Sequence, residues 1–164
     1  MFTFERFKEN HLSLLRRWLN AEHSKDIWQE SDDIGKLKIK FLDELPRQGV
    51  LPFVIAKDHK PIGYIQYYDA TKVGGGWWEA ELNGTFGIDL MIGSSVHHGR
   101  GFGPTIIKEF IGFVRQKESS IRSIIIDPAP KNRRAIRAFE KAGFVKESEI
   151  ETPDGTALLM RMTF

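Results

Sequence analysis

The sequence predicts an α/β (α+β) domain whose central sheet is mixed but mostly antiparallel, with six to seven strands flanked by about four helices. Segments in which apolar residues recur at every second position, as in strands, alternate along the chain with segments in which they recur at helical spacing. Turn residues mark two hairpins. In addition, a strand, a glycine-rich loop, a helix and another strand follow one another from residue 85, which is the order of a parallel β-α-β crossover.

Length and composition favour one domain, residues 1–164, because 41% of the 164 residues are hydrophobic. The 24 basic and 22 acidic residues leave a formal charge of +2, which is too balanced to indicate a nucleic-acid partner. Charges interrupt residues 1–19 and no run of about 18 apolar residues occurs, so we expect no signal peptide, no membrane span and a cytoplasmic protein. The chain has no cysteine, which excludes disulfides and an acyl-cysteine intermediate.

The first 50 residues predict one strand and two helices. Residues 2–7 alternate apolar and polar side chains, as a half-buried strand does. Apolar residues recur at helical spacing over residues 10–22, with Asn10 as the candidate N-cap. A second helix is expected over residues 34–45, ending before Pro46 because proline disfavours helical conformation in the residue that precedes it.

The middle of the chain predicts an antiparallel hairpin and a further strand. Residues 53–56 and 62–68 read as strands joined by a turn at residues 58–61. Residues 85–92 form another strand, on which Asp89 shares a face with Gly87 and Met91.

The last third predicts two helices and three strands. Apolar spacing favours helices over residues 104–117 and 132–142, and a short apolar strand over residues 121–126 lies between them. Residues 144–151 and 157–162 form a terminal hairpin around a Pro-Asp-Gly turn.

The segment His98-Gly99-Arg100-Gly101-Phe102-Gly103, followed by Pro104-Thr105, predicts a seat for a phosphate or pyrophosphate. Its glycines let backbone N–H groups converge on an anion, and the next helix adds the positive end of its dipole. A Walker loop would need Gly-Lys-Ser/Thr, and a dinucleotide fingerprint would need glycine in place of Ile106. The sequence therefore excludes both of these common phosphate motifs.

The loop resembles the pyrophosphate signature Arg/Gln-x-x-Gly-x-Gly/Ala of the GCN5-related N-acetyltransferases (GNAT), with His98 at the first position. The run from Asn132 to Phe144 resembles the second signature of that superfamily. Further segments are similar to the aminoglycoside 6′-N-acetyltransferases: Gly76-Trp77-Trp78-Glu79, Gly87-Ile88-Asp89 and Thr152-Pro153-Asp154-Gly155. The resemblance implies the GNAT fold and an acetyl-CoA-dependent enzyme that acetylates a primary amine of an aminoglycoside antibiotic, the 6′-amine, and confers resistance.

Asp89 is the candidate catalytic residue. An amine attacks a thioester only when it is unprotonated, so a base is needed near the nucleophile. Apolar neighbours of Asp89 would raise the pKa of its carboxyl. By resemblance, the aspartate of Gly-Ile-Asp acts as this base or orients the amine; the alternative is that Asp89 only caps or pairs with a local group.

The resemblance also implies which residues hold the two substrates. Those for coenzyme A are His98, Gly99, Arg100, Gly101, Phe102, Gly103, Thr105, Asn132 and Phe139. Those for a polycationic aminoglycoside are Trp28, Trp77, Trp78, Glu79, Asp127 and Asp154, assisted by Glu81 or Glu151. Each acidic residue has a plainer alternative as a turn residue or a solvated side chain. Lys131, Arg133 and Arg134 either meet the ribose phosphate or form a solvated helix face.

Phe139 departs from the superfamily, in which a tyrosine often protonates the departing thiolate at this position. Phenylalanine has no hydroxyl, so water, or one of the tyrosines at 64, 67 and 68, is the remaining proton source. Two other functions stay open. One is the same fold acting on a protein amino terminus, a siderophore or a polyamine. The other is a non-catalytic acyl-CoA-binding module. No metal site is expected, since His97 and His98 lack a spaced partner.

Overall fold

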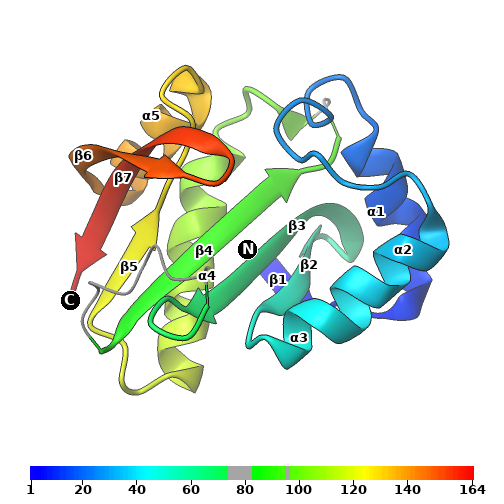
Figure 1. Ribbon diagram of the computed structural model, residues 1–164, viewed down its shortest axis with the longest axis horizontal. Helices are drawn as coiled ribbons and strands as arrows, with labels where there is room; N and C mark the ends of the chain where they lie inside the picture. Colours follow the sequence, from blue (N-terminus) through cyan, green and yellow to red (C-terminus); the bar gives the residue numbers. More distant parts are fainter. Residues whose placement is uncertain (74–82, 95–96) are drawn as a thin grey trace. The chain divides into compact units, whose positions relative to one another are not determined.

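The structure is a computed structural model that describes residues 1–73, 83–94 and 97–164 (Figure 1). The chain divides into two compact units. Unit 1 comprises Met1–Tyr67 and Asp89–Arg100, and unit 2 comprises Tyr68–Ile88 and Gly101–Phe164.

Unit 1 contains β1 (Phe2–Arg6), β2 (Leu51–Lys57) and most of β3 (Lys60–Asp69), together with the second half of β4 (Thr85–Ile92). β1 pairs antiparallel with β2, and β2 with β3. Asp58 and His59 form the tight turn between β2 and β3, with φ angles of 50° and 63°. Two left-handed residues are what a two-residue hairpin turn requires, so the predicted hairpin is confirmed.

The helical part of unit 1 begins with a 3-10 turn, Glu9–His11, and continues as α1 (Leu12–Leu19). Asn10 lies inside this turn, and the Lys8 N–H donates to His11 Nδ1 at 3.0 Å, so Asn10 as N-cap is wrong. The helix also ends earlier than residue 22. Asn20 Nδ2 donates to the Arg16 carbonyl oxygen at 2.8 Å, and a side chain bonding to the last turn offers the backbone an alternative to helix.

The second helical segment runs through Pro46, where the sequence predicted an end. It consists of α2 (Ile34–Ile39), a π-helical turn (Lys40–Glu44) and α3 (Leu45–Arg47), with Pro46 near the start of α3. The Leu45 N–H donates to the Lys40 carbonyl oxygen, five residues back. This wider turn changes which carbonyl faces the proline, so the missing N–H and the ring are accommodated without ending the helix.

The core of unit 1 forms where these helices cover the strands (Figure 1). α1 contributes its predicted apolar face, and Leu37 and Phe41 come from the second segment. They pack against strand side chains that include Val54, Tyr64 and Met91. The amphipathic spacing therefore predicted the buried face correctly.

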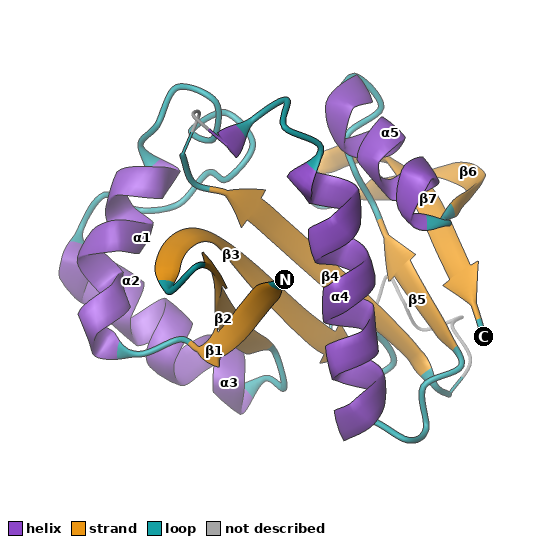
Figure 2. Cartoon of the chain, turned by 180° about the vertical axis from the view of Figure 1, so that it is seen from behind, coloured by secondary structure: helices purple, strands orange, loops and turns teal. Residues whose placement is uncertain are grey.

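Unit 2 contains α4 (Phe102–Lys117), β5 (Ser123–Ile126), α5 (Arg133–Ala142), β6 (Val145–Thr152) and β7 (Gly155–Thr163). Figure 2 shows α4 and α5 on the same side of these strands. The start of β4 pairs in parallel with β5, in the register Thr85↔Ser123 and Gly87↔Ile125. The predicted crossover is thereby confirmed.

The seven strands follow the order β1-β2-β3-β4-β5-β7-β6. β5 and β6 both pair antiparallel with β7, so β4 and β5 supply the parallel pair of a mixed, mostly antiparallel sheet, as predicted. Among the described residues, no helix combines the length and apolar character needed to cross a membrane.

Candidate active site

Asp89 lies on β4 directly opposite Gln66 on β3. The Gly93 N–H donates to the Ile62 carbonyl oxygen at 2.8 Å, and continuing this antiparallel register brings residue 66 opposite residue 89. Gln66 Nε2 donates to Asp89 Oδ2 at 2.8 Å. The predicted base is therefore held by a cross-strand partner that the sequence analysis did not select.

Tyr64 precedes Gln66 on the same face of β3 and extends this chain of hydrogen bonds. Its hydroxyl donates to Gln66 Oε1 at 2.6 Å, and its side chain is fully buried. The rings of Phe7, Phe41 and Trp28 meet the Tyr64 ring edge to face, with centroids 5.4 to 5.9 Å away. Packing therefore fixes the direction in which the hydroxyl points.

The carboxyl of Asp89 responds to two opposing influences. Burial raises its pKa from its ordinary value, and the hydrogen bond from Gln66 acts in the other direction. Burial, followed by the negative charges of Asp89 and Glu30, raises the pKa of Tyr64, so this hydroxyl keeps its proton at neutral pH. A carboxyl with a raised pKa that remains partly exposed can accept a proton from a ligand.

Among the described residues of unit 1, the predicted substrate residue Trp28 lies close to this cluster. It is partly exposed, and its ring lies 5.8 Å from that of Tyr64. The Trp28 N–H donates to the Ser24 carbonyl oxygen at 2.8 Å. The segment between α1 and α2 therefore presents an aromatic side chain beside the Tyr64–Gln66–Asp89 chain.

The glycine-rich segment has the backbone that its sequence predicts. Gly99 and Gly101 take left-handed φ angles of 71° and 72°, and no described atom lies within 4 Å of the place where a Cβ would stand at either residue. Gly101 precedes the first turn of α4, where backbone N–H groups have no partner within the helix. Left-handed residues next to a helix start form a concave, anion-binding backbone, so these residues fit a pyrophosphate.

Behind this segment, Gly103 allows α4 to approach α5 within unit 2. A Cβ on Gly103 would lie 3.3 Å from the Ala138 Cβ, which is tight for a side-chain contact. Phe102 is partly buried and Thr105 is exposed in the first turn of α4.

His98, at the first signature position, bonds to the backbone at the end of β4. Its Nε2 lies 3.1 Å from the Ile92 carbonyl oxygen, and His23 Nε2 lies at the same distance from the same atom. The two rings meet edge to face with centroids 4.2 Å apart. A carbonyl oxygen only accepts, so both Nε2 atoms carry hydrogen in this arrangement. Arg100 is exposed beside it.

Unit 2 holds further predicted residues, of which Asn132, Phe139 and Asp154 have local structural roles. Asn132 Oδ1 caps α5 by accepting from the Ala135 N–H at 3.3 Å. Phe139 is buried against Phe144, with ring centroids 5.5 Å apart. Asp127 follows β5 and is partly exposed. Asp154 is exposed at the β6–β7 turn, where its N–H donates to Thr152 Oγ1.

The remaining predicted residues either lie outside the described residues or are exposed side chains in unit 2. Trp77, Trp78, Glu79 and Glu81 lie outside the described residues. Lys131, Arg133 and Arg134 are exposed. Glu151 accepts from Thr156 Oγ1 at 2.8 Å. Within the described ranges, no group of three or more His, Asp or Glu side chains is placed to hold a metal ion.

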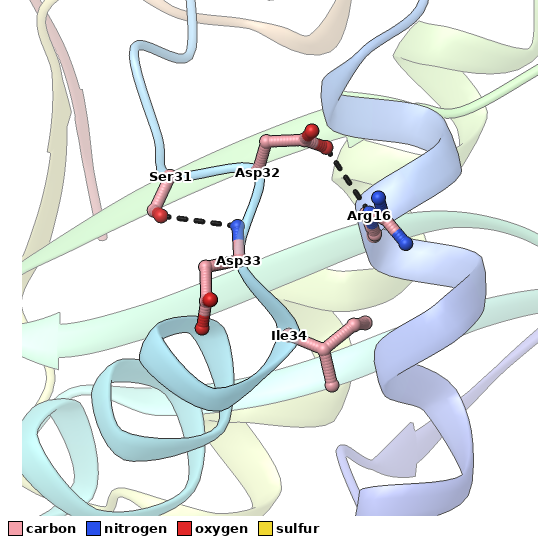
Figure 3. A pocket seen from close by; sticks show the side chains of 5 residues that line it. All are labelled: Arg16, Ser31, Asp32, Asp33 and Ile34. Atoms are coloured by element: carbon pink, nitrogen blue, oxygen red, sulfur yellow. Dashed lines mark hydrogen bonds and ion pairs between the residues drawn. The ribbon is translucent and has the colours of Figure 1, made fainter.

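An open hollow of about 580 Å³ lies elsewhere in unit 1, where α1 faces the start of α2 (Figure 3). Arg16, Ser31, Asp32, Asp33 and Ile34 line it. Arg16 Nε contacts Asp32 Oδ1 at 3.1 Å, and the Asp33 N–H donates to Ser31 Oγ. None of the predicted site residues lines this hollow, and its charged groups are already paired locally.

Sequence reasoning missed Gln66, His23 and the role of Tyr64 in holding Gln66. A signal for Gln66 was present: it is a polar residue at alternate spacing within the otherwise apolar strand of residues 62–68. Its partner depends on the β3–β4 register, which no local pattern specifies. His23 lies in a polar segment, and only the fold brings it to Ile92.

Comparison with known proteins gives a consistent assignment. A family model described as an acetyltransferase (GNAT) domain matches residues 8–152. The aminoglycoside N(6′)-acetyltransferase type 1 of Klebsiella pneumoniae is 32% identical over 166 aligned residues, covering 98% of this chain and 82% of that protein. The match thus extends well beyond the two short signatures.

Solved structures of aminoglycoside acetyltransferases agree with this family assignment. The aminoglycoside acetyltransferase AAC(6′)-Ib in complex with coenzyme A superposes with a TM-score of 0.92 at 32% identity, covering 99% of this chain and 95% of the other. The same enzyme with coenzyme A and kanamycin gives a TM-score of 0.91 at 32% identity, with the same coverage of both chains.

Proposed function

Because the chain belongs to the GNAT acetyltransferase family, we propose that it transfers the acetyl group of acetyl-CoA to the 6′-amine of an aminoglycoside antibiotic and thereby confers resistance. The observation that carries this proposal is the similarity along 98% of the chain to an aminoglycoside N(6′)-acetyltransferase. The solved complex of AAC(6′)-Ib with coenzyme A and kanamycin supports the choice of both substrates.

In the proposed reaction, Asp89 prepares the acceptor amine. Acetyl-CoA supplies an acetyl group activated as a thioester. The acceptor is largely protonated near neutral pH, so it must lose a proton before its lone pair can attack. The carboxylate of Asp89 takes this proton, and its raised pKa brings its basicity closer to that of the amine.

The glycine-rich segment is suited to the diphosphate of the cofactor. Gly99 and Gly101 leave the backbone open, and the N–H groups that begin α4 have no partner within the helix and can donate to phosphate oxygens. We assign Thr105, which is exposed in the first turn, to the same diphosphate through its hydroxyl. We assign Asn132 to the pantetheine arm through its side-chain nitrogen, because its oxygen already caps α5. His98 fixes the segment's start to β4 and contacts the cofactor through its backbone.

The thiolate leaves without a protein acid at position 139. Phe139 is buried and has no hydroxyl, and Tyr64 and Tyr67 are buried as well, whereas Tyr68 is half-buried and stays the alternative to water. A thiol with a pKa of about 8.5 is a tolerable leaving group, so water can protonate it.

A thiol-release assay tests the proposal. Acetyl-CoA is incubated with the protein and one of three acceptor classes: kanamycin-type aminoglycosides, polyamines such as spermidine, or peptides with a free amino terminus. We expect free thiol only with the aminoglycosides. Release with polyamines or peptides would identify another class of amine as the acceptor. Tight coenzyme A binding without acceptor-dependent release would identify a binding module. We propose the cytoplasm, the compartment expected from the sequence, as the site of action.

A further inference from the structure

We propose that Gln66 is a positioning residue that holds Asp89 through Oδ2, so that Oδ1 receives the proton of the acceptor amine, and that Tyr64 fixes the direction of the Gln66 amide. The inference rests on the proposed function for its chemical meaning. Its geometry and its test do not depend on which amine is the acceptor.

The first step is the placement of the pair. Gln66 and Asp89 lie directly opposite on neighbouring antiparallel strands, where cross-strand side chains come closest. The 2.8 Å bond joins Gln66 Nε2 to Oδ2 alone. In the described part of the chain, Oδ1 receives no hydrogen bond, and Asp89 remains partly exposed. One oxygen is therefore held, and the other is left without a described donor and can accept a proton from a ligand.

The second step is the orientation of the amide. Gln66 serves Asp89 only when Nε2 faces the carboxylate, and a flipped amide would place oxygen against oxygen. Tyr64 prevents the flip because its hydroxyl donates to Oε1 at 2.6 Å. The hydroxyl keeps its proton, and its ring is enclosed by Phe7, Trp28 and Phe41.

The third step is the consequence for the base. Gln66 donates to the ionised form of Asp89, so it opposes the effect of burial on the pKa of this carboxyl. Two other charges act on the pKa of the neighbouring Tyr64, which the negative charge of Glu30 raises and the positive charge of Arg6 lowers. A carboxyl without the Gln66 bond would stay protonated to higher pH and would be free to rotate.

Three variants form a graded test. Tyr64→Phe keeps the ring and releases the amide, Gln66→Met removes the donor at similar length, and Gln66→Glu places a second carboxyl beside Asp89. Gln48→Met, at an exposed position after α3, is the matched control. The readouts are the pH profile of kcat/KM with saturating acetyl-CoA and the carbon-13 NMR titration of the Asp89 carboxyl.

The acidic limb of the profile and the Asp89 titration should both move to higher pH, in the order Tyr64→Phe, Gln66→Met, Gln66→Glu. We expect about one pH unit for Gln66→Met, which corresponds to about a tenfold loss of kcat/KM at a fixed pH on that limb. The KM for acetyl-CoA should stay unchanged, and Gln48→Met should behave as the unsubstituted protein.

Activity losses with an unmoved acidic limb and an unmoved Asp89 titration would overturn the proposal and leave Gln66 a structural residue. The NMR titration needs no turnover, so it tests the Gln66 role even if no aminoglycoside is acetylated. If Gln66→Met fails to fold, Tyr64→Phe supplies the same comparison with the packing retained.

Discussion

At the residue scale, Asp89 joins two demands that normally conflict. Burial makes the carboxyl basic enough to take a proton, while the Gln66 bond keeps it ionised and oriented. The side chain remains partly exposed, as a base that must reach a ligand requires. The energetic consequence is that the fold carries an ionised group that burial disfavours.

Replacing Asp89 with asparagine should lower kcat by about 10² to 10⁴, because the base is lost while the shape is kept. The KM for acetyl-CoA should change little. Steady-state kinetics at a pH of about 7.5, which lies above the ordinary pKa range of a carboxyl, check this prediction. Asp43→Asn, on the exposed side of the π-helical turn, is the control. An Asp89→Asn variant with normal kcat would remove Asp89 from the reaction.

The same substitution should raise the melting temperature at neutral pH. The folded-state pKa of Asp89 lies above its unfolded value of about 3.9, so ionisation costs folding stability as pH rises from that value through the folded-state pKa. Asparagine has no such cost and its oxygen still accepts from Gln66. The gain should therefore grow through this window and vanish near about pH 3. Thermal denaturation across pH measures it, and a gain independent of pH would contradict the account.

At the element scale, the sequence predicted every strand of the described sheet and the apolar faces of the helices, because periodicity reflects burial directly. The sequence did not predict where the first two helical segments end or which side chains meet across strands. The end of α1 depends on the Asn20 side chain, and the passage of Pro46 depends on a π-helical turn, which leaves no periodic signal. Gln66 was missed for a related reason, since its partner Asp89 is set by strand register.

Two variants of Asn132 can separate its role as the cap of α5 from its proposed role in binding the cofactor. Asn132→Ala should lose about 1 kcal/mol of stability, because the cap on α5 is removed. Asn132→Ser retains a capping oxygen and should keep the melting temperature. Both variants should raise the KM for acetyl-CoA, since both lose the side-chain nitrogen. An unchanged KM in the serine variant would show that Asn132 acts only as a cap.

Gly93 should be intolerant of a side chain. A Cβ there would lie 2.2 Å from three atoms of the buried Trp18 ring, so Gly93→Ala should cost about 1–3 kcal/mol through overpacking. Gly112→Ala in α4 is the matched control, because no described atom lies within 4 Å of its added Cβ. That variant should gain about 0.5–1 kcal/mol of stability. Equal melting temperatures for the two variants would contradict the close approach of Trp18.

At the scale of the whole molecule, the β4–α4–β5 crossover and the glycine-rich segment agree with a family match over residues 8–152. Both could be predicted from sequence because glycine and proline placement has direct backbone consequences. The aminoglycoside acceptor was predicted only through the family resemblance, and Trp77, Trp78 and Glu79, which carry much of that resemblance, lie outside the described residues. The single-domain organisation stays a prediction.

The central claim is acetyl transfer to the 6′-amine of an aminoglycoside. The most direct measurement compares neomycin and paromomycin, which differ only in an amine or a hydroxyl at the 6′ position, with mass spectrometry and NMR of the products. The account predicts a single acetyl group on the 6′-nitrogen of neomycin and no acetylation of paromomycin. An acetyl group on another amine, or equal modification of both compounds, would contradict it.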